Sequence, residues 1–341
     1  MKRIAINGLG RIGRLALRRY ITSHEKAVTV VAANDLTPLD ELEYLFRYDS
    51  AHGPFPDDVS IEKKRLKLGE TFIEISHEKN PANLPWGEKG VDIVLECTGA
   101  FRSRKEASGH LDAGASKVII SAPSDDVDIT IVLGVNEKSY NPKQHHVISN
   151  ASCTTNSLAP AAKILNDSFG IESLFATTIH AYTASQSLVD RAMRKRRRGR
   201  AAAISLIPTT TGAAKATEMV LPELSGKMDA MAVRAPVLDG AITDIVAHVA
   251  SEVSVEDVNR AFMDAAKVEM SGILEYCETE PVSVDIIDNP HSSILDAEST
   301  KVVASDRLVK ILVWYDNEYG YASRMIDLAK YIASAQLYNV H

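Results

Sequence analysis

Short apolar runs alternate with segments of helical spacing through the first half of the chain. The apolar runs are rich in β-branched residues, and they read "RIAING", "VTVVAAND", "VDIVLECTG", "KVIISAP" and "HHVISN". The segment "GRLALRRYITS" between the first two has the periodicity of an amphipathic helix. This rhythm is typical of βαβ units and predicts a mostly parallel sheet.

The pattern changes after residue 153. A helix is predicted through "TTNSLAPAAKILNDSFG", followed by longer alternating segments such as "SLFATTIHAYT", "DAMAVRAPV" and "AITDIVAHVASEV". Alternation over such lengths predicts strands of an antiparallel or mixed sheet. Near the end, "RLVKILVWYDN" predicts a strand and "YGYASRMIDLAKYIASAQ" a closing helix, with one apolar face formed by Met325, Leu328, Ile332 and Ala335.

Length, charge and cysteine content narrow the class of protein. With 341 residues the chain exceeds the size of one core, so we expect two domains, 1–150 and 151–316. The net charge of −7 argues against nucleic acid or an anionic membrane as the main partner. No run reaches the length of a membrane span, and the start "KRIAING" reads as a strand, so we expect a cytoplasmic protein. Three widely separated cysteines predict reduced thiols and no metal site.

A glycine motif follows the first predicted strand. In "INGLGRIGR", Gly8, Gly10 and Gly13 have GxGxxG spacing at the start of a helix. Such glycines allow a tight turn, close approach of the backbone to a pyrophosphate, and close packing of helix on strand. The second strand ends in Asp35, at the offset of a carboxylate that binds an adenosine ribose. The motif predicts a dinucleotide site, and Asp35 favours NAD over NADP because it repels a 2′-phosphate.

Cys153 is the strongest candidate for chemistry. It stands in "SNASCTTNS" among small hydroxyl and amide residues, whereas Cys97 in "VDIVLECTG" has the apolar neighbours of a packed thiol. A catalytic thiol needs a base or a cation nearby. His180 in "TTIHAYTASQ" ends a predicted strand and is the candidate base.

Two later segments suggest anion pockets. "IPTTTGAAKA" places Thr209–Thr211 and Gly212 in a loop that enters a helix. Arg234 in "AVRAP" lies in an apolar strand, where a buried guanidinium needs an anionic partner; the alternative is a structural ion pair. Together with the dinucleotide motif, these features suggest oxidation of a phosphorylated aldehyde.

Five motifs resemble the phosphorylating glyceraldehyde-3-phosphate dehydrogenases, in family order and over essentially the whole chain: "INGLGRIGR", "SNASCTTNS", "HAYTASQ", "IPTTTGAAKA" and "WYDNEYGYASR". The resemblance implies an α/β fold, with a Rossmann-type dinucleotide-binding domain completed by the C-terminal helix, 317–337, and an α+β catalytic domain with a mostly antiparallel sheet. It also implies a homotetramer that uses NAD to convert glyceraldehyde 3-phosphate and inorganic phosphate to 1,3-bisphosphoglycerate, in glycolysis or gluconeogenesis.

The resemblance assigns a role to each matching residue. Cys153 is the nucleophile that forms a thiohemiacetal and then a thioester, and its backbone helps to hold the oxyanion; His180 is the base. The substrate phosphate matches Thr183 and Arg234, and the attacking phosphate matches Ser152, Thr154, Thr211 and Gly212. The cofactor contacts match Gly8, Gly10, Arg11, Ile12, Gly13, Asp35, Lys79, Ser121 and Asn317, the last of these holding the nicotinamide carboxamide.

The chain departs from the family pattern at a few positions. Ser157 replaces a second cysteine, and Tyr319 replaces a tryptophan, which we expect to be a packing variation. In "VDRAMRKRRRGRAAA", Arg191 and Ala192 stand where NAD-specific relatives commonly show Leu-Pro. An arginine there suggests secondary use of NADP, although a solvated surface charge is the simpler interpretation.

The sequence also suggests two alternative functions. Erythrose-4-phosphate dehydrogenase shares the scaffold but generally lacks "HAYT" and does not use inorganic phosphate, so "HAYTASQ" and "TTTGAAKA" argue against it. The basic run 194–200, "RKRRRGR", suggests a secondary RNA or polyanion-binding role.

Overall fold

The computed structural model describes residues 1–24 and 26–337. Two compact units make up the chain. The first consists of Met1–Ile131, Lys138–Ala151 and the chain from Ala322, and the second of Val132–Glu137 and Ser152–Tyr321.

The first unit is built on a nine-stranded sheet with the order β3-β4-β5-β2-β1-β6-β7-β9-β8. The antiparallel pairs β3–β4 and β4–β5 form one edge, and the remaining neighbours pair in parallel. The strands are β1 (Lys2–Asn7), β2 (Val28–Asn34), β3 (Val59–Glu62), β4 (Arg65–Leu68), β5 (Thr71–Ser76), β6 (Ile93–Glu96), β7 (Lys117–Ile120), β8 (Ile129–Thr130) and β9 (Val147–Ser149).

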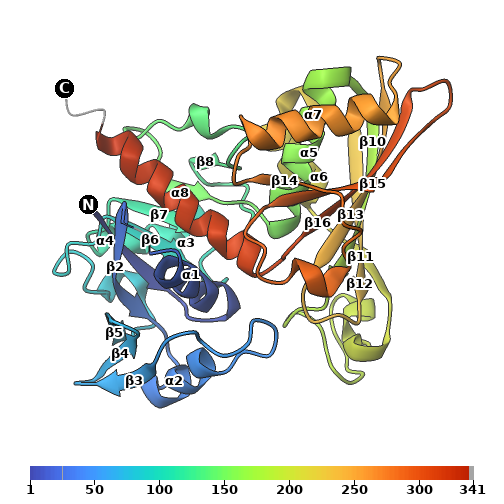
Figure 1. Ribbon diagram of the computed structural model, residues 1–341. Helices are drawn as coiled ribbons and strands as arrows, with labels where there is room; N and C mark the ends of the chain where they lie inside the picture. Colours follow the sequence, from blue (N-terminus) through green and yellow to red (C-terminus); the bar gives the residue numbers. More distant parts are fainter. Residues whose placement is uncertain (25, 338–341) are drawn as a thin grey trace. The chain divides into compact units, whose positions relative to one another are not determined.

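Helices connect these strands, as Figure 1 shows. They are α1 (Arg11–Thr22), α2 (Leu39–Arg47), α3 (Arg104–Ala107) and α4 (Gly109–Asp112), with the short 3₁₀ turns η1 (Pro81–Asn83) and η2 (Glu137–Ser139). The central strands β6 and β7 are buried at every position, as expected for a parallel sheet covered on both faces. Parallel pairing aligns Asn7 with Asn34 and with Glu96, so polar residues collect at the carboxyl edge of the sheet. The α/β Rossmann-type prediction is confirmed.

The second unit is built on a seven-stranded sheet with the order β11-β12-β10-β13-β16-β15-β14. Parallel pairing occurs at β10–β12 and β14–β15, and the other neighbours are antiparallel, so the mostly antiparallel sheet is also confirmed. The strands are β10 (Ile171–Ala181), β11 (Ile207–Thr210), β12 (Met228–Ala235), β13 (Ala241–Val249), β14 (Leu274–Cys277), β15 (Ser293–Val303) and β16 (Leu308–Tyr315).

Helices cover one face of this sheet. They are α5 (Cys153–Phe169), α6 (Ala213–Val220) and α7 (Val255–Lys267). The last described helix, α8 (Tyr319–Leu337), belongs to the first unit from Ala322 onward. The 3₁₀ turns are η3 (Arg196–Gly199), η4 (Ala202–Ile204), η5 (Pro222–Leu224) and η6 (Ser283–Ile286). Burial alternates strictly along β13, so only one face of the sheet packs against these helices. The other face carries large apolar side chains, among them Phe175 and Met231, which are 68% and 45% exposed.

Within the described residues, no helix combines the length and apolar character that crossing a membrane requires.

Candidate active site

The glycine motif has a defined geometry at the end of β1. Gly8 has a φ of +91°, and a Cβ there would lie 2.7 Å from the backbone nitrogen of Thr98. A Cβ on Gly13 would lie 1.9 Å from the carbonyl oxygen of Gly8, so only glycine lets α1 approach β1 this closely. No described atom lies within 4 Å of a Cβ on Gly10, which leaves room for a ligand against the backbone.

The amino end of α1 can bind an anion. The helix begins at Arg11, and the first backbone bond inside it runs from Arg14 N–H to Gly10 O. The N–H groups of Arg11, Ile12 and Gly13 therefore have no acceptor within the helix, and they carry the positive end of its dipole. The Arg11 side chain forms an ion pair with Asp49 at 2.5 Å, so Arg11 would hold a pyrophosphate through its backbone.

A pocket of about 450 Å³ lies beside this motif, lined by Gly8, Gly10, Asp35, Leu36, Lys79 and Thr98 among others. Asp35 accepts hydrogen bonds from Leu9 N–H at 2.5 Å and Thr37 N–H at 2.8 Å. These bonds fix the carboxylate and leave lone pairs that can accept from a ribose hydroxyl. The pocket therefore fits an adenosine dinucleotide. Ser121 directly follows β7, and Cys97 lines this pocket.

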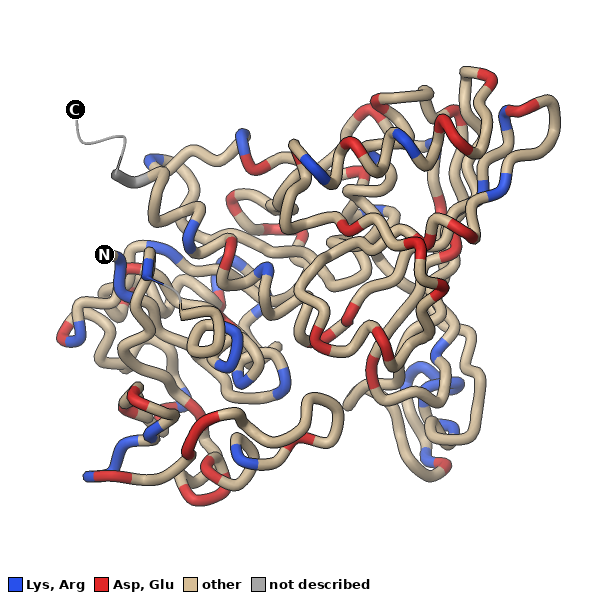
Figure 2. The backbone as a smooth tube through the Cα atoms, viewed as in Figure 1, with Lys and Arg blue, Asp and Glu red and all other residues tan. Residues whose placement is uncertain are grey.

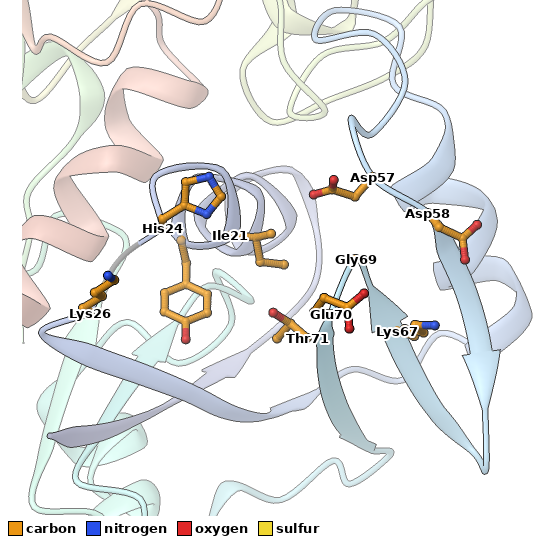
Figure 3. A pocket seen from close by; sticks show the side chains of 10 residues that line it. Ile21, His24, Lys26, Asp57, Asp58, Lys67, Gly69, Glu70 and Thr71 are labelled. Atoms are coloured by element: carbon orange, nitrogen blue, oxygen red, sulfur yellow. The ribbon is translucent and has the colours of Figure 1, made fainter.

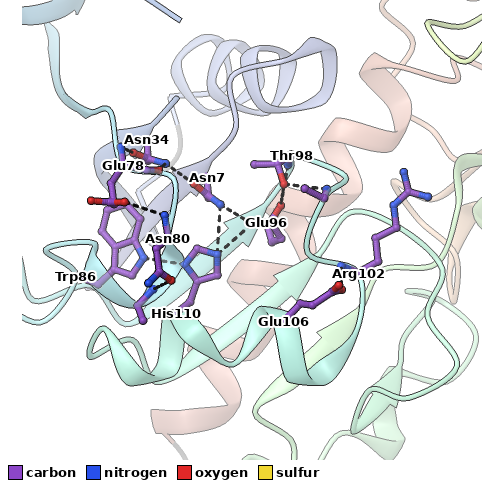
Figure 4. Close-up of polar contacts among 12 residues, drawn as sticks. Asn7, Asn34, Glu78, Asn80, Trp86, Glu96, Thr98, Arg102, Glu106 and His110 are labelled. Carbon is purple, nitrogen blue, oxygen red and sulfur yellow. Dashed lines mark hydrogen bonds and ion pairs between the residues drawn. The ribbon is translucent and has the colours of Figure 1, made fainter. Parts of the chain in front are cut away.

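A buried network of hydrogen bonds fixes several residues that line this pocket (Figure 4). Asn7 donates to Glu96 Oε2 at 2.5 Å and accepts from Asn34 at 2.8 Å. Glu96 Oε1 accepts from Thr98 N–H at 2.8 Å. Asn7, Asn34 and Thr98 all line the pocket. Glu96 holds Asn7 and Thr98 directly, and Asn7 in turn holds Asn34.

His110 completes this network in one tautomer. The Trp86 indole N–H donates to His110 Nδ1 at 3.0 Å, and an indole can only donate. Nδ1 is therefore an acceptor, and His110 Nε2 carries the proton that it donates to Glu96 at 3.0 Å. Both partners are fully buried, and this fixed geometry satisfies the Glu96 carboxylate without a charged histidine.

The candidate nucleophile begins α5 in the second unit. Ser152 is the N-cap and accepts from Thr155 N–H at 3.0 Å, and Cys153 is the first helical residue. The preceding residue, Ala151, has a φ of +55°, a left-handed conformation that turns the chain sharply into the helix. Cys153 Sγ lies 3.5 Å from Nε2 of His180, which ends β10, so the expected thiol and base are brought into contact.

The side chains of Cys153 and His180 are both uncharged. Burial raises the pKa of the Cys153 thiol, although the Arg234 charge and hydrogen bonds from Thr154 act in the opposite direction. Burial, followed by the Arg234 charge, lowers the pKa of His180 to about 3. The pair is therefore a thiol and an imidazole, and the thiolate forms when His180 takes the proton.

The other ring nitrogen of His180 faces two competing partners. Nδ1 lies 2.7 Å from the Ala181 carbonyl oxygen, which requires a proton on Nδ1. It also contacts Nη1 of Arg234, which can only donate and so requires a bare Nδ1. Only the tautomer with the proton on Nδ1 leaves Nε2 free to accept from Cys153. An anion that draws Arg234 away would favour that tautomer.

Tyr315 forms the floor of the site, and the sequence analysis did not identify it. Its hydroxyl lies 3.0 Å from Thr154 Oγ1 and 2.8 Å from Thr178 Oγ1. Its ring meets the His180 ring edge to face, with centroids 6.0 Å apart. Tyr315 belongs to the motif "WYDNEYGYASR", but its residue type and its place at a strand end assign it no role.

The side-chain contacts of Arg234 argue against the alternative of a structural ion pair. Its Nη1 donates to Ala181 O at 2.8 Å and contacts His180, and both of these groups are neutral. Its Nε is buried without a partner among the described residues. A structural ion pair is therefore the weaker interpretation, and the guanidinium suits a bound anion.

A second arginine joins this region and was missed by the sequence analysis. Arg198 Nε donates to Thr209 Oγ1 at 3.1 Å, and Nη1 donates to Ser185 Oγ at 3.3 Å. Its charge helps to lower the pKa of both His180 and Arg234. Ser185 in turn contacts Thr183 Oγ1 at 2.8 Å. Two cations and several hydroxyls thus surround the thiol and imidazole, which is the composition of a phosphate site.

The threonine loop also differs from the expectation in one respect. Thr209 and Thr210 belong to β11, so only Thr211 and the N-cap Gly212 form the turn that enters α6. Thr211 Oγ1 accepts from Ala213 N–H at 3.2 Å. The hydroxyls of Ser152 and Thr154 are engaged with Thr155 and Tyr315, so these two residues offer backbone groups more readily than side chains.

Most of the basic run is exposed, and Figure 2 shows its Lys and Arg residues gathered on one loop. Arg194, Arg196 and Arg197 are exposed, whereas Arg198 is half-buried because it turns toward Thr209. Arg191 is exposed and donates to Ser187 Oγ at 2.7 Å.

Asn317 lies in the turn between β16 and α8 and is buried, and its Oδ1 has no partner within the described part of the chain. A buried acceptor of this kind suits an amide N–H₂ such as a nicotinamide carboxamide.

Cys97, expected to be a packed thiol, is only partly buried and lines the dinucleotide pocket. Burial raises its pKa, so it is a poor nucleophile.

Another cavity, of about 520 Å³, lies in the first unit between the end of α1 and the strands β4 and β5 (Figure 3). Its walls mix Lys26 and Lys67 with Asp57, Asp58 and Glu70, and it contains none of the predicted site residues.

The fold and these sites define a dehydrogenase that combines a dinucleotide-binding domain with a cysteine and histidine pair. Comparison with known proteins agrees. The family model "Glyceraldehyde 3-phosphate dehydrogenase, NAD binding domain" matches residues 2–104, and the model of the C-terminal domain of the same enzyme matches residues 152–317.

Curated relatives match nearly end to end. The chain is 51% identical to glyceraldehyde-3-phosphate dehydrogenase of Geobacillus stearothermophilus over 335 residues, which cover 98% of this chain and 99% of the relative. It is 50% identical, with the same coverage, to glyceraldehyde-3-phosphate dehydrogenase 1 of Bacillus subtilis strain 168. The chain belongs to the glyceraldehyde-3-phosphate dehydrogenase family, and it is an NAD-dependent oxidoreductase that acts on an aldehyde.

Proposed function

We propose that the chain oxidises and phosphorylates glyceraldehyde 3-phosphate to 1,3-bisphosphoglycerate through a covalent intermediate on Cys153. The observation that carries this proposal is the contact of 3.5 Å between Cys153 Sγ and His180 Nε2, beside Arg234 and Arg198. A thiol, a base and two cations together suit an aldehyde that bears a phosphate.

His180 takes the thiol proton, and the sulfur of Cys153 attacks the aldehyde carbon. His180 returns this proton to the carbonyl oxygen, which gives the thiohemiacetal and leaves the imidazole neutral. His180 then accepts the hydroxyl proton as the carbonyl re-forms, while the hydride leaves with its electron pair; bound NAD supplies the hydride acceptor. Inorganic phosphate attacks the resulting thioester, forms the acyl phosphate and releases the thiolate. The N–H of Cys153 at the start of α5 stabilises the oxyanion.

The proposed binding residues divide between two phosphates. Arg234 and Thr183 hold the substrate phosphate, and Ser152, Thr154, Thr211 and Gly212, to which we add Arg198, hold the attacking phosphate. Cofactor binding is assigned to the domain 1–150 completed by 317–337, through Gly8, Gly10, Arg11, Ile12, Gly13, Asp35, Lys79, Ser121 and Asn317; catalysis is assigned to 151–316.

The test is a steady-state assay with and without inorganic phosphate. We expect NADH formation from glyceraldehyde 3-phosphate to depend on phosphate and to exceed the rate with erythrose 4-phosphate. Phosphate-independent turnover with erythrose 4-phosphate as the better substrate would establish the rival activity.

Cofactor preference should depend on Asp35. Its carboxylate is fixed by Leu9 and Thr37 beside the ribose position, so it repels a 2′-phosphate. Arg191 is exposed and therefore screened, so we expect NAD preference with measurable NADP activity. Replacing Asp35 by Gly should raise the NADP to NAD ratio of kcat/KM by about tenfold or more, as expected for removal of an unfavourable charge contact of about 1.4 kcal/mol.

The effect of Arg191 on the NADP to NAD ratio is measured in the same assay. Arg191→Leu should lower only the NADP activity, and more so at low salt. An unchanged ratio of NADP to NAD activity would mean that Arg191 is a solvated surface charge.

We also propose that the chain forms a homotetramer and works in the cytoplasm. The face of the second sheet opposite its helices carries exposed Phe175 on β10 and Met231 on β12, a surface that a second copy would cover. Light scattering of the purified protein measures the assembly directly.

The free state of the three cysteines supports the proposed cytoplasmic location, because thiols stay reduced in that compartment.

A further inference from the structure

A basic cavity of about 540 Å³ lies in the first unit, at the amino ends of its parallel strands. Lys2 begins β1, Lys117 begins β7, and His146 directly precedes β9, so these residues share one edge of the sheet. Lys143, in the turn before β9, also lines the cavity. The dinucleotide pocket lies at the opposite, carboxyl edge of the same strands, so the two sites are separate.

The charged side chains that line this cavity are all basic. No acidic residue is among the described residues of the lining. Lys2 forms an ion pair with Asp92 at 2.8 Å, and Asp92 lies outside the lining. Lys143 is exposed, and its ammonium forms no ion pair with any residue that the structure describes. The positive charge of the cavity is therefore only partly neutralised.

Lys117 is a buried cation at the wall of the cavity, and it is 2% exposed. Its Nζ donates to the carbonyl oxygens of Pro142 at 2.6 Å and His145 at 2.7 Å. Within the described chain, no carboxylate is close enough to Nζ for an ion pair. Carbonyl groups satisfy the hydrogens of an ammonium but do not neutralise its charge, so this buried cation favours a bound anion.

The carboxylate of Asp128 acts on Lys117 through space, but it is engaged elsewhere. Its Oδ1 pairs with Arg104 Nε at 2.6 Å, and its Oδ2 accepts from the backbone N–H groups of His146 and Val147 at 2.7 and 2.9 Å. Burial lowers the pKa of Lys117, and Asp128 opposes this only in part. An anion in the cavity would stabilise the charged form of the lysine further.

His146 offers one ring nitrogen to a ligand. Its Nδ1 lies 3.4 Å from Lys117 Nζ and 3.3 Å from the Ser116 carbonyl oxygen. These neighbours occupy Nδ1, so Nε2 is the nitrogen left for a bound group. Leu111, Ala115 and Pro142 complete the lining with apolar surface.

We propose that this cavity binds a small organic phosphate, with its phosphate group between Lys117, Lys143 and His146 and its apolar part against the apolar lining residues. Ammonium groups and an imidazole N–H are the donors that bind phosphate in proteins. The volume is that of a small-molecule site and exceeds what a single phosphate ion fills. The site is apart from Cys153 and His180, so the proposal does not depend on the proposed reaction.

The test uses phenyl phosphate as the probe and Lys143 as a local reporter. The protein is saturated with NAD and treated with acetic anhydride, and the acetylation rate of each lysine is measured by mass spectrometry. The reagent attacks the neutral amine, and a bound phosphate keeps the amine protonated and covered. At ten times the Kd of phenyl phosphate, about a tenth of the sites stay empty, so Lys143 should react about tenfold more slowly. An unchanged rate would overturn the proposal.

The control in the same protein is Lys138, an exposed lysine of η2 outside the cavity, whose acetylation rate should not change. Two variants then locate the phosphate. Lys117→Met removes the buried cation, and His146→Phe keeps a ring but has no donor. Each should raise the phenyl phosphate concentration that half-protects Lys143 by about tenfold, as for loss of one hydrogen bond to a charged group.

Thermal unfolding identifies a variant that fails to fold, and the other variant then carries the test. Unchanged half-protection in the folded variants would overturn the placement of the phosphate. Steady-state kinetics of both variants should match the native protein, because neither residue belongs to the catalytic site.

Inorganic phosphate distinguishes an organic ligand from a free ion. It has no apolar part to bury, so it should protect Lys143 only at higher concentrations than phenyl phosphate does. Equal half-protection by the two probes would overturn the organic ligand and assign the cavity to a free phosphate ion.

Discussion

Replacing Cys153 by serine should abolish NADH formation while leaving the fold and NAD binding intact. A serine hydroxyl is far less acidic than a thiol, so His180 cannot convert it to a nucleophile as it does the thiol of Cys153. We expect kcat to fall by at least about a thousandfold, as for removal of other covalent nucleophiles.

The control is Cys277→Ser, the same atomic change in a thiol away from the site, whose Sγ lies 3.2 Å from Thr279 Oγ1. That variant should retain native activity. NAD titration and thermal unfolding of Cys153→Ser should match the native protein. Turnover within tenfold of the native rate in Cys153→Ser would exclude the covalent mechanism.

Local patterns in the sequence were sufficient to predict the nucleotide-binding unit. The turn at Gly8, the packing at Gly13 and the carboxylate of Asp35 are each determined within one βαβ unit, where spacing along the chain fixes position in space. The alternation along "AITDIVAHVASEV" likewise predicted a strand of an antiparallel or mixed sheet, and β13 pairs antiparallel with both of its neighbours. Cys153 and His180 were found by their residue types, and the fold then placed them in contact.

The residues that were missed depend on tertiary contacts. Arg198 lies in a run of charges whose members look alike in the sequence, and only the fold turns this one toward Thr209 and Ser185. Tyr315 gains its role from Thr154 and Thr178, which are 161 and 137 residues away along the chain. Chemistry that depends on long-range juxtaposition and burial cannot be read from spacing.

Replacing Arg234 by leucine should reduce kcat/KM for glyceraldehyde 3-phosphate by two orders of magnitude or more. Removing one partner of a buried, hydrogen-bonded charge pair costs about 2–5 kcal/mol, which corresponds to roughly 30-fold to several-thousand-fold. The upper part of this range applies because Arg234 Nε is buried and has no competing partner among the described residues. For Arg234→Lys we expect a kcat/KM between those of the native protein and Arg234→Leu, since lysine keeps the charge but loses the planar guanidinium.

Unphosphorylated glyceraldehyde separates phosphate binding from effects on the catalytic pair. Loss of the Arg234 charge removes one influence that lowers the pKa of Cys153, which makes the thiolate harder to form. The same loss removes the donor that competes with Ala181 for His180 Nδ1, which favours the tautomer able to accept the thiol proton. These effects oppose each other, so we expect kcat/KM for this substrate to change by less than about tenfold. Arg307→Leu, an exposed arginine paired with Glu252, is the control for loss of a positive charge. Equal losses on both substrates would mean that Arg234 serves the structure of the site, and that the substrate phosphate is held elsewhere.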